Sequence, residues 1–207
     1  IILVLNEYPE LINNISKIHL MGGWTEKYTE NGLELRSSYN WNMDPNSSKI
    51  LLEKINIPII LYSSHIIRNY FSGGSIQMKN YPQIIETLEQ VSDILPSVAE
   101  TFIAFKSWNN HVMDHYPWLE KIIGREYSSR QFTPVDPIII IGSNFPDFIA
   151  KKKKVKINFI EDDIDVNRGF RLEVKPSLGS NIELVDSVDV AVFEIAMIEA
   201  FQKLINR

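Results

Sequence analysis

The spacing of apolar and polar positions predicts a strand, a helix and a second strand in the first third of the chain. Residues 17–21 alternate and stop at a Gly-Gly pair, which is typical of a short strand that ends in a turn. Asp44 and Pro45 predict a helix start, because aspartate accepts the free amide hydrogens of a first turn and proline fits its first position. Residues 58–62 form a compact apolar run, as in a strand covered on both faces. This order predicts a βαβ unit.

The rest of the chain predicts helices and a late β-hairpin. Residues 82–116 space their apolar side chains for one buried helix face, and Pro96 is expected to kink or split this helix. Residues 155–160 and 169–174 alternate like the two strands of a hairpin. Residues 189–204 have the pattern of an amphipathic helix. The order of elements therefore favours an α/β fold with a late β-hairpin.

Two stretches of the first half need separate mention. Residues 1–7 are short and apolar and are expected to be the last turns of a helix whose beginning is absent. The chain does not begin with Met, so we expect it to be cut from something longer. Residues 25–38 are polar and contain the turn signal Asn31-Gly32, which predicts a loop.

Composition narrows the classes of function. With 207 residues the chain is long enough to bury one sizeable core, which favours one domain. A net charge of −5 argues against nucleic acid as a partner, since nucleic-acid binders carry a basic face. The absence of cysteine excludes disulfides, thiolate catalysis and Cys-ligated metals. No apolar run reaches the roughly 18 residues that a membrane-spanning helix needs.

Three clusters of charged or ligating side chains have an ordinary interpretation that outweighs the functional one. His111 and His115 are four apart and could share a metal on one helix face, but a half-exposed polar face is favoured. The acidic residues 161–165 could hold a hard cation, but they lack calcium-loop spacing and fit a solvated hairpin turn better. The lysine run 151–154 could attract a phosphate, but such runs are usually solvated.

Three other places are more unusual. Met21-Gly22-Gly23 ends a strand, where missing side chains let the backbone approach a ligand. Residues 38–45 put amides and an aromatic ring just before a helix. Asp136 stands between turn residues and precedes a very apolar run. Taken separately, each has an ordinary explanation in tight packing, helix capping or a turn.

Their order along the chain resembles that of the inosine/uridine-preferring nucleoside hydrolase family. The resemblance begins at residues 18–23, continues through Tyr39-Asn40, Asp44-Pro45 and the strand after Pro58, and then through residues 135–137 to the last helix. It covers essentially all 207 residues. It implies an α/β fold with a mostly parallel sheet flanked by helices, of which residues 1–207 would form the C-terminal portion.

The resemblance also implies a reaction and a set of site residues. Family members hydrolyse the N-glycosidic bond of ribonucleosides with a calcium ion that binds the ribose hydroxyls and activates water. Asp136 matches a calcium-ligating aspartate of the family, and Met21 matches a methionine that lines the sugar pocket. Asn40 matches an asparagine that binds ribose, and Asn31 matches a second one within a residue or two.

Several family positions have changed or are missing. The Asp-rich motif that supplies most calcium ligands has no counterpart here and would lie before Ile1. Ser38 replaces a glutamate that contacts ribose, Val135 replaces a histidine that assists the leaving base, and His65 falls near the place of an aspartate. Because calcium takes about six to eight oxygen ligands, Asp136 is not expected to retain it alone.

Two hypotheses follow. The first is a catalytically impaired nucleoside hydrolase-like chain with a structural or interaction role, in which calcium is absent or weakly bound. The alternative is an active calcium-dependent ribohydrolase whose Asp-rich half is supplied by an absent segment or a second chain. Without that half, residues 59–61 and 138–141 are expected to expose apolar faces. We therefore expect the N-terminal half of the fold, or other subunits of an oligomer or complex, to cover them.

Overall fold

A computed structural model gives the fold of the chain, and it describes residues 2–25, 28–30, 33–35, 41, 44–71, 81–100, 136–165 and 169–206. The chain divides into two compact units. The first consists of Ile1–Ile67 and Ile149–Val188, and the second of Arg68–Phe148 and Asp189–Arg207. No described helix is long and apolar enough to cross a membrane.

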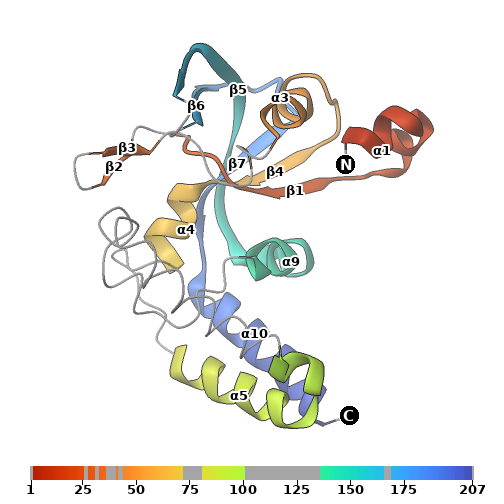
Figure 1. Cartoon of the computed structure of the whole chain (residues 1–207), viewed down its shortest axis with the longest axis vertical. Helices are drawn as coiled ribbons and strands as arrows, with labels where there is room; N and C mark the ends of the chain where they lie inside the picture. Colours follow the sequence, from red (N-terminus) through yellow and green to blue (C-terminus); the bar gives the residue numbers. More distant parts are fainter. Residues whose placement is uncertain are drawn as a thin grey trace. The chain divides into compact units, whose positions relative to one another are not determined.

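The first unit contains a five-stranded sheet in the order β1-β4-β7-β5-β6 (Figure 1). β1 (Ile18–Met21), β4 (Ile59–Tyr62) and β7 (Ile182–Val188) are parallel neighbours. β5 (Ile149–Asp165) pairs antiparallel with β7 and with β6 (Gly169–Pro176). The predicted α/β class and the late hairpin are confirmed, and the parallel part of the sheet holds three strands.

The βαβ unit is also confirmed. Between β1 and β4 lies α3 (Pro45–Glu53), which starts where the sequence predicts. Oδ1 of Asp44 accepts a hydrogen bond of 3.0 Å from the amide of Ser47, so the aspartate caps the helix. α1 (Ile2–Glu7) is followed by a 3-10 helix, η1 (Pro9–Asn14).

Two sequence-based expectations for this unit were wrong or incomplete. Residues 25–38 are not wholly a loop, because β2 (Tyr28–Glu30) and β3 (Leu33–Leu35) pair there as an antiparallel hairpin. The strand β7 was not predicted at all, although it lies between β4 and β5.

The apolar face of residues 59–61 is covered by this chain itself. Ile59 and Leu61 are 0% exposed and Ile60 is 1% exposed, so the expectation that another segment must cover them was wrong. The expectation for residues 138–141 was partly wrong, because Ile138 and Ile141 are buried whereas Ile140 is 65% exposed. The core of the first unit joins side chains of α1, α3, β1, β4, β5 and β7 with two residues outside these elements, Trp41 and Ile57. The members from the six elements are Ile2, Leu5, Ile18, Leu51, Leu52, Ile59, Leu61, Val155, Ile157, Ile182 and Leu184.

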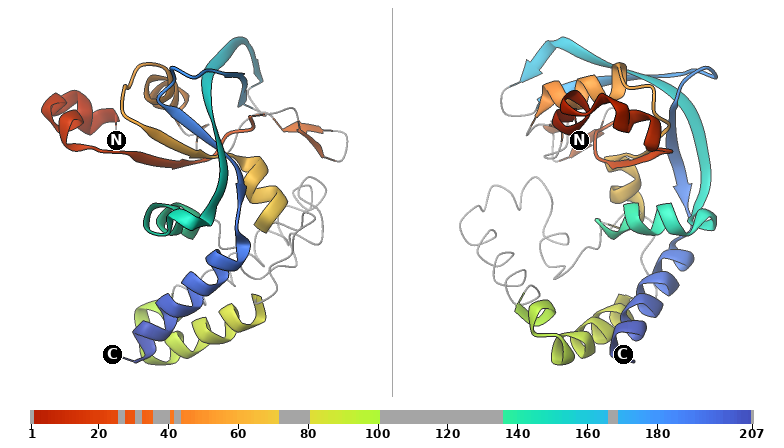
Figure 2. Two further views of the ribbon diagram at one scale, coloured as in Figure 1. Left: turned by 180° about the vertical axis from the view of Figure 1, so that it is seen from behind. Right: turned by 90° about the vertical axis from the view of Figure 1, so that its right-hand side faces the viewer.

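The described part of the second unit is helical. α5 (Tyr81–Ile94) stops before Leu95, and residues 96–100 resume a helix, so Pro96 splits the segment as predicted. α10 (Val190–Ile205) lies beside α5, as the views in Figures 1 and 2 show. α9 (Pro137–Asn144) and η2 (Pro146–Phe148) complete it, and α4 (Ser64–Phe71) spans the boundary between the units.

Candidate functional site

The carboxyl ends of the parallel strands β1 and β4 form the candidate site, since ligands of parallel α/β sheets are met at this edge. β1 ends at Met21 and is followed by Gly22 and Gly23, whose φ angles are 134° and 76°. Glycine adopts such positive angles without steric cost. The amide of Gly22 donates to the carbonyl of Tyr62 (2.9 Å), and the amide of Ser64 donates to the carbonyl of Gly23 (2.9 Å). The Gly-Gly turn is thus held against the end of β4.

The space over Gly23 is filled by side chains of this chain. A Cβ atom on Gly23 would lie 2.7 Å from Cζ3 of Trp41 and 3.0 Å from Cδ1 of Leu172. Trp41 is 6% exposed, and its Nε1 donates to the carbonyl of Met21 over 3.3 Å. Its ring stacks on Phe159 with centroids 6.4 Å apart. The packing interpretation of the Gly-Gly turn is therefore confirmed, and Trp41 belongs to the core of the first unit.

The residues after the turn meet the start of α4. The rings of Trp24 and His65 make an edge-to-face contact with centroids 4.9 Å apart. Nδ1 of His65 lies 3.5 Å from the hydroxyl oxygen of Thr25, which is 7% exposed. His65 thus packs against the segment that continues from β1.

A second polar pair, which sequence reasoning missed, lies on the sheet beside this turn. Nδ1 of His19 is 3.1 Å from the hydroxyl of Tyr62, and the two rings stack with centroids 5.9 Å apart. Burial, followed by the positive charges of Lys17 and Lys152, lowers the pKa of His19 below its ordinary value. Burial raises the pKa of Tyr62, which is 0% exposed. A neutral tyrosine that donates a hydrogen bond to a neutral histidine is consistent with the lowered pKa of His19 and the raised pKa of Tyr62.

The predicted βαβ unit already indicated that His19 and Tyr62 lie on neighbouring strands. β1 and β4 are parallel, with Met21 opposite Tyr62 and His19 opposite Ile60. His19 and Met21 are two residues apart in a strand, so they share one face of the sheet with Tyr62. The register, which the sequence does not give, was needed to see the pairing.

Asp136, the proposed calcium ligand, stands at the N-cap position of α9. Its side chain is exposed and makes no capping hydrogen bond. Among the residues that the structure describes, no three or more His, Asp or Glu side chains are grouped to hold a metal ion. One carboxylate supplies at most about two of the six to eight oxygens that calcium takes, so the described residues do not fit this ion.

The other residues implied by the resemblance are placed as follows. Met21 is half-buried at the end of β1 in the first unit, and Asp136 belongs to the second unit. Asn31 and Asn40 lie outside the described residues, as do Ser38 and Val135. The histidine pair His111 and His115 also lies outside them.

The lysine run proves to be part of the sheet. Lys151, Lys152 and Lys153 lie in β5 and form ion pairs with two acids of β7. Lys152 contacts Glu183 at 2.7 Å, and Lys153 contacts Asp186 at 3.0 Å. These lysines are exposed but are not simply solvated, because carboxylates on the neighbouring strand partly neutralise them. The acidic residues 161–165 belong to the same strand, but the structure describes only their backbone.

Comparison with known proteins gives only similarities to solved structures. No family model matches this chain, and no curated protein matches it. Among solved structures, an inosine-uridine preferring nucleoside hydrolase from Bacillus anthracis aligns with 97% of this chain at 15% sequence identity and a TM-score of 0.47. The chain spans 55% of the length of that structure. At this level the similarity concerns the backbone arrangement and says nothing of what this chain binds.

Proposed function

We propose that this chain is a nucleoside hydrolase-like domain with a structural or interaction role and without nucleosidase activity of its own. The order of the Met-Gly-Gly turn, the Asp-Pro helix start and Asp136 supports the kinship. Ser38 and Val135, which replace a ribose contact and a leaving-group acid of that family, support the loss of catalysis.

The packing over Gly23 carries the proposal. A strand end that receives a ligand needs open space above its glycines, whereas Trp41 and Leu172 lie within 3.0 Å of the position of a Cβ on Gly23. Trp41 is also tied to the carbonyl of Met21 by its indole Nε1. Trp41 belongs to the core of the first unit and Leu172 packs against that core, so a ligand would have to displace this packing to enter.

An activity assay tests the proposal directly. The purified chain is incubated with inosine or uridine in the presence of calcium chloride, and released ribose is measured with and without EDTA. We expect no release above the uncatalysed background. Release that calcium sustains and EDTA abolishes would overturn the proposal.

The interaction role that we propose is association with a second copy of the chain or with another subunit. Val4 and Tyr8, in and just after α1, are 49% and 52% exposed, and they offer apolar surface to a second copy of the chain or another subunit. Light scattering coupled to size-exclusion chromatography is expected to give a mass greater than that of one chain. A mass of one chain at all concentrations, with no change in the V4S or Y8S variants, would contradict self-association.

An active calcium-dependent ribohydrolase, completed by an Asp-rich half from an absent segment or second chain, is the second candidate. The observation that favours it is Asp136, which occupies an N-cap position without capping the helix and keeps its carboxylate exposed. Calcium titration calorimetry separates the candidates when Asp136→Asn is compared with Asp147→Asn, a change at another exposed acid. Calcium binding that only Asp136→Asn weakens would favour the second candidate. The chain without an added Asp-rich half is expected to bind none under either candidate, because one carboxylate supplies at most about two calcium ligands.

A further inference from the structure

A polar pocket lies at the opposite edge of the sheet from the candidate site. It has a volume of about 460 Å³ and lies between the end of α3, the middle of β5 and the turn that joins β6 to β7. Ile182, the first residue of β7, lines it. Because β1, β4 and β7 are parallel, the amino end of β7 and the carboxyl end of β1 lie at opposite edges. The pocket is therefore separate from the Met21–Gly23 turn.

The segments around the pocket are fixed by hydrogen bonds of their own. Nδ2 of Asn181 donates to the carbonyls of Ile55 (2.8 Å) and Ile57 (2.7 Å), which ties the turn to the segment after α3. Oε1 of Glu53 accepts from the amide of Phe159 over 3.1 Å, which ties α3 to β5. A pocket whose walls are already ordered loses little conformational entropy when it binds a ligand.

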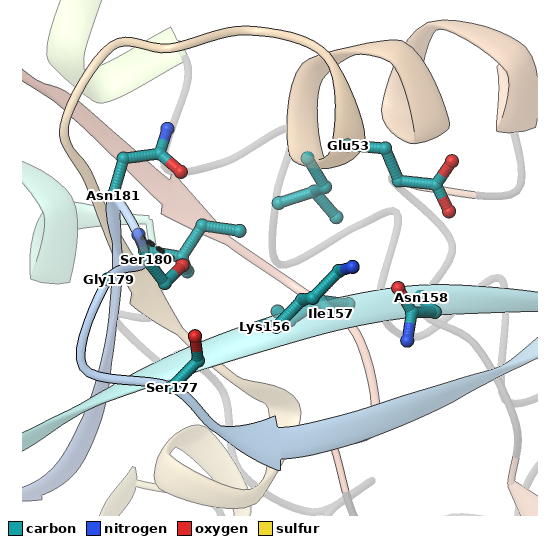
Figure 3. Close-up of a pocket in the computed structure, with 10 residues that line it drawn as sticks. Glu53, Lys156, Ile157, Asn158, Ser177, Gly179, Ser180 and Asn181 are labelled. Atoms are coloured by element: carbon teal, nitrogen blue, oxygen red, sulfur yellow. Dashed lines mark hydrogen bonds between the residues drawn. The ribbon is translucent and has the colours of Figure 1, made fainter.

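The floor of the pocket is apolar and its walls supply hydrogen-bond donors. Leu52, Ile157 and Ile182 are 5%, 1% and 2% exposed. Figure 3 shows the turn with Ser177 and Ser180 on one side of the space and Glu53 on the other. The Ser180 hydroxyl oxygen accepts from the amide of Ile182 (3.1 Å), so its own hydrogen is free to be donated.

Lys156 gives the pocket its positive charge. Lys151, Lys152 and Lys153 on the same strand each have a carboxylate partner. The ammonium of Lys156 makes no ion pair or hydrogen bond with any residue in the described part of the chain, and neither does the Ser177 hydroxyl. Glu53 and Asn158 are engaged with Phe159 and Glu173 respectively. The ammonium of Lys156 and the hydroxyls of Ser177 and Ser180 are thus the donors left open, and the negative charge of Glu53 lies across the pocket from the turn.

We propose that this pocket binds a small organic anion whose carboxylate or phosphate group contacts Lys156, Ser177 and Ser180 while its apolar part lies on the floor. An ammonium beside hydroxyl donors is the arrangement that recognises oxyanions. The volume is in the range of about 300–1,000 Å³ typical of small-molecule sites. Gly179 leaves the turn side open, since a Cβ there would meet no atom within 4 Å.

Titrations of the ¹⁵N-labelled chain with benzoate and with inorganic phosphate test the proposal by amide chemical shifts. Benzoate is expected to give saturable shifts at the amides of residues 177–182, and to bind more tightly than phosphate because it also covers the apolar floor. Saturable shifts with phosphate alone, or equal affinity for both probes, would overturn the claim that the apolar part of the ligand lies on the floor of the pocket. Absence of shifts with both would overturn the whole proposal.

Matched lysine variants make the test specific. Lys156→Met is expected to weaken benzoate binding about tenfold, the usual effect of losing a charge-assisted hydrogen bond. Lys154→Met removes a charge from the same strand outside the pocket, and it is expected to leave the affinity unchanged. Equal weakening in both variants would show attraction by net charge and would overturn the site. Spectra without ligand show whether each variant keeps its fold.

Discussion

The ring of Trp41 lies against the backbone of Gly23, so closely that a Cβ atom on the glycine would be 2.7 Å from Cζ3 of the indole. The two residues are brought together by the turn after β1, where Gly23 has a φ of 76°. Both the space and the backbone angle therefore require glycine at this position. The Met-Gly-Gly motif serves here to admit a core tryptophan at the end of a parallel strand.

Gly23→Ala is expected to destabilise the chain. The positive φ costs about 1–2 kcal/mol in an L-residue, and the clash with Trp41 adds about 1–3 kcal/mol of overpacking. Urea unfolding followed by circular dichroism measures the loss. Gly179→Ala is the control, because a Cβ there meets nothing within 4 Å. Similar free energies of unfolding for the two variants would contradict the packing described for Gly23.

Local signals in the sequence were sufficient for the elements whose determinants are neighbours in the chain. The start of α3 depends on Asp44, whose carboxylate binds an amide three residues away. The break after α5 depends on Pro96, whose ring and missing amide hydrogen act within one helical turn. Each of these signals acts within a few residues, so the sequence alone predicts it.

The strand β7 escaped prediction because its pattern depends on a partner strand. Glu183 and Asp186 interrupt its apolar residues, and both are paired with lysines of β5, more than 30 positions earlier in the chain. The contact of Trp41 with Gly23 likewise joins segments on either side of the β2–β3 hairpin. Such relationships follow from the register of the sheet, which the sequence does not state.

His19 is expected to remain neutral at pH values where an ordinary histidine is charged. Its pKa is lowered by burial and by Lys17 and Lys152, whereas in the unfolded chain it has the ordinary value of about 6.5. As the pH falls below about 6.5, the unfolded chain takes up the proton first, so the free energy of unfolding decreases down to the folded pKa. NMR titration of the imidazole ring measures the pKa directly.

Two variants test why the pKa of His19 is lowered. Lys17→Met is expected to raise the pKa of His19, because a nearby positive charge is removed. The rise is expected to be modest, since burial is the larger cause and is unchanged. His19→Gln is expected to reduce the loss of stability between neutral and mildly acidic pH. A pKa of His19 at or above the ordinary value would contradict the burial of this ring.

Asp186 links stability to pH in a more acidic range. Hydrogen bonds from Lys153 and then Lys151 lower its pKa, against the opposing effect of burial. A lowered carboxyl pKa contributes stability above the unfolded value of about 3.9, and this stability is lost as the pH falls through the folded value. Asp186→Asn is expected to cost at most about 1 kcal/mol at pH 7, because the pair is partly exposed.

The control for Asp186 is Asp147→Asn, which removes an exposed carboxylate from η2. Urea midpoints at pH 7 and pH 3 separate the two variants. The gap between wild type and Asp186→Asn is expected to be smaller at pH 3 than at pH 7, because at pH 3 the carboxyl of the unfolded chain is mostly protonated. A gap as large at pH 3 as at pH 7 would mean that the pairing with lysine is not the source of the effect.

Asn181 is expected to be a major contributor to the stability of the first unit. Its Nδ2 donates to the carbonyls of Ile55 and Ile57, which precede β4, while its own backbone leads into β7. Asn181→Ala removes both donors and leaves partly buried carbonyls without partners, at a cost of about 1–3 kcal/mol.

Asn144→Ala is the matched control, because Nδ2 of Asn144 donates to Ile140 and Ser143 at an exposed helix end. Water replaces these exposed bonds, so the control is expected to lose less than about 0.5 kcal/mol. Urea unfolding of both variants measures the difference, and equal losses would show that the Asn181 amide is not what fixes the segment between α3 and β4.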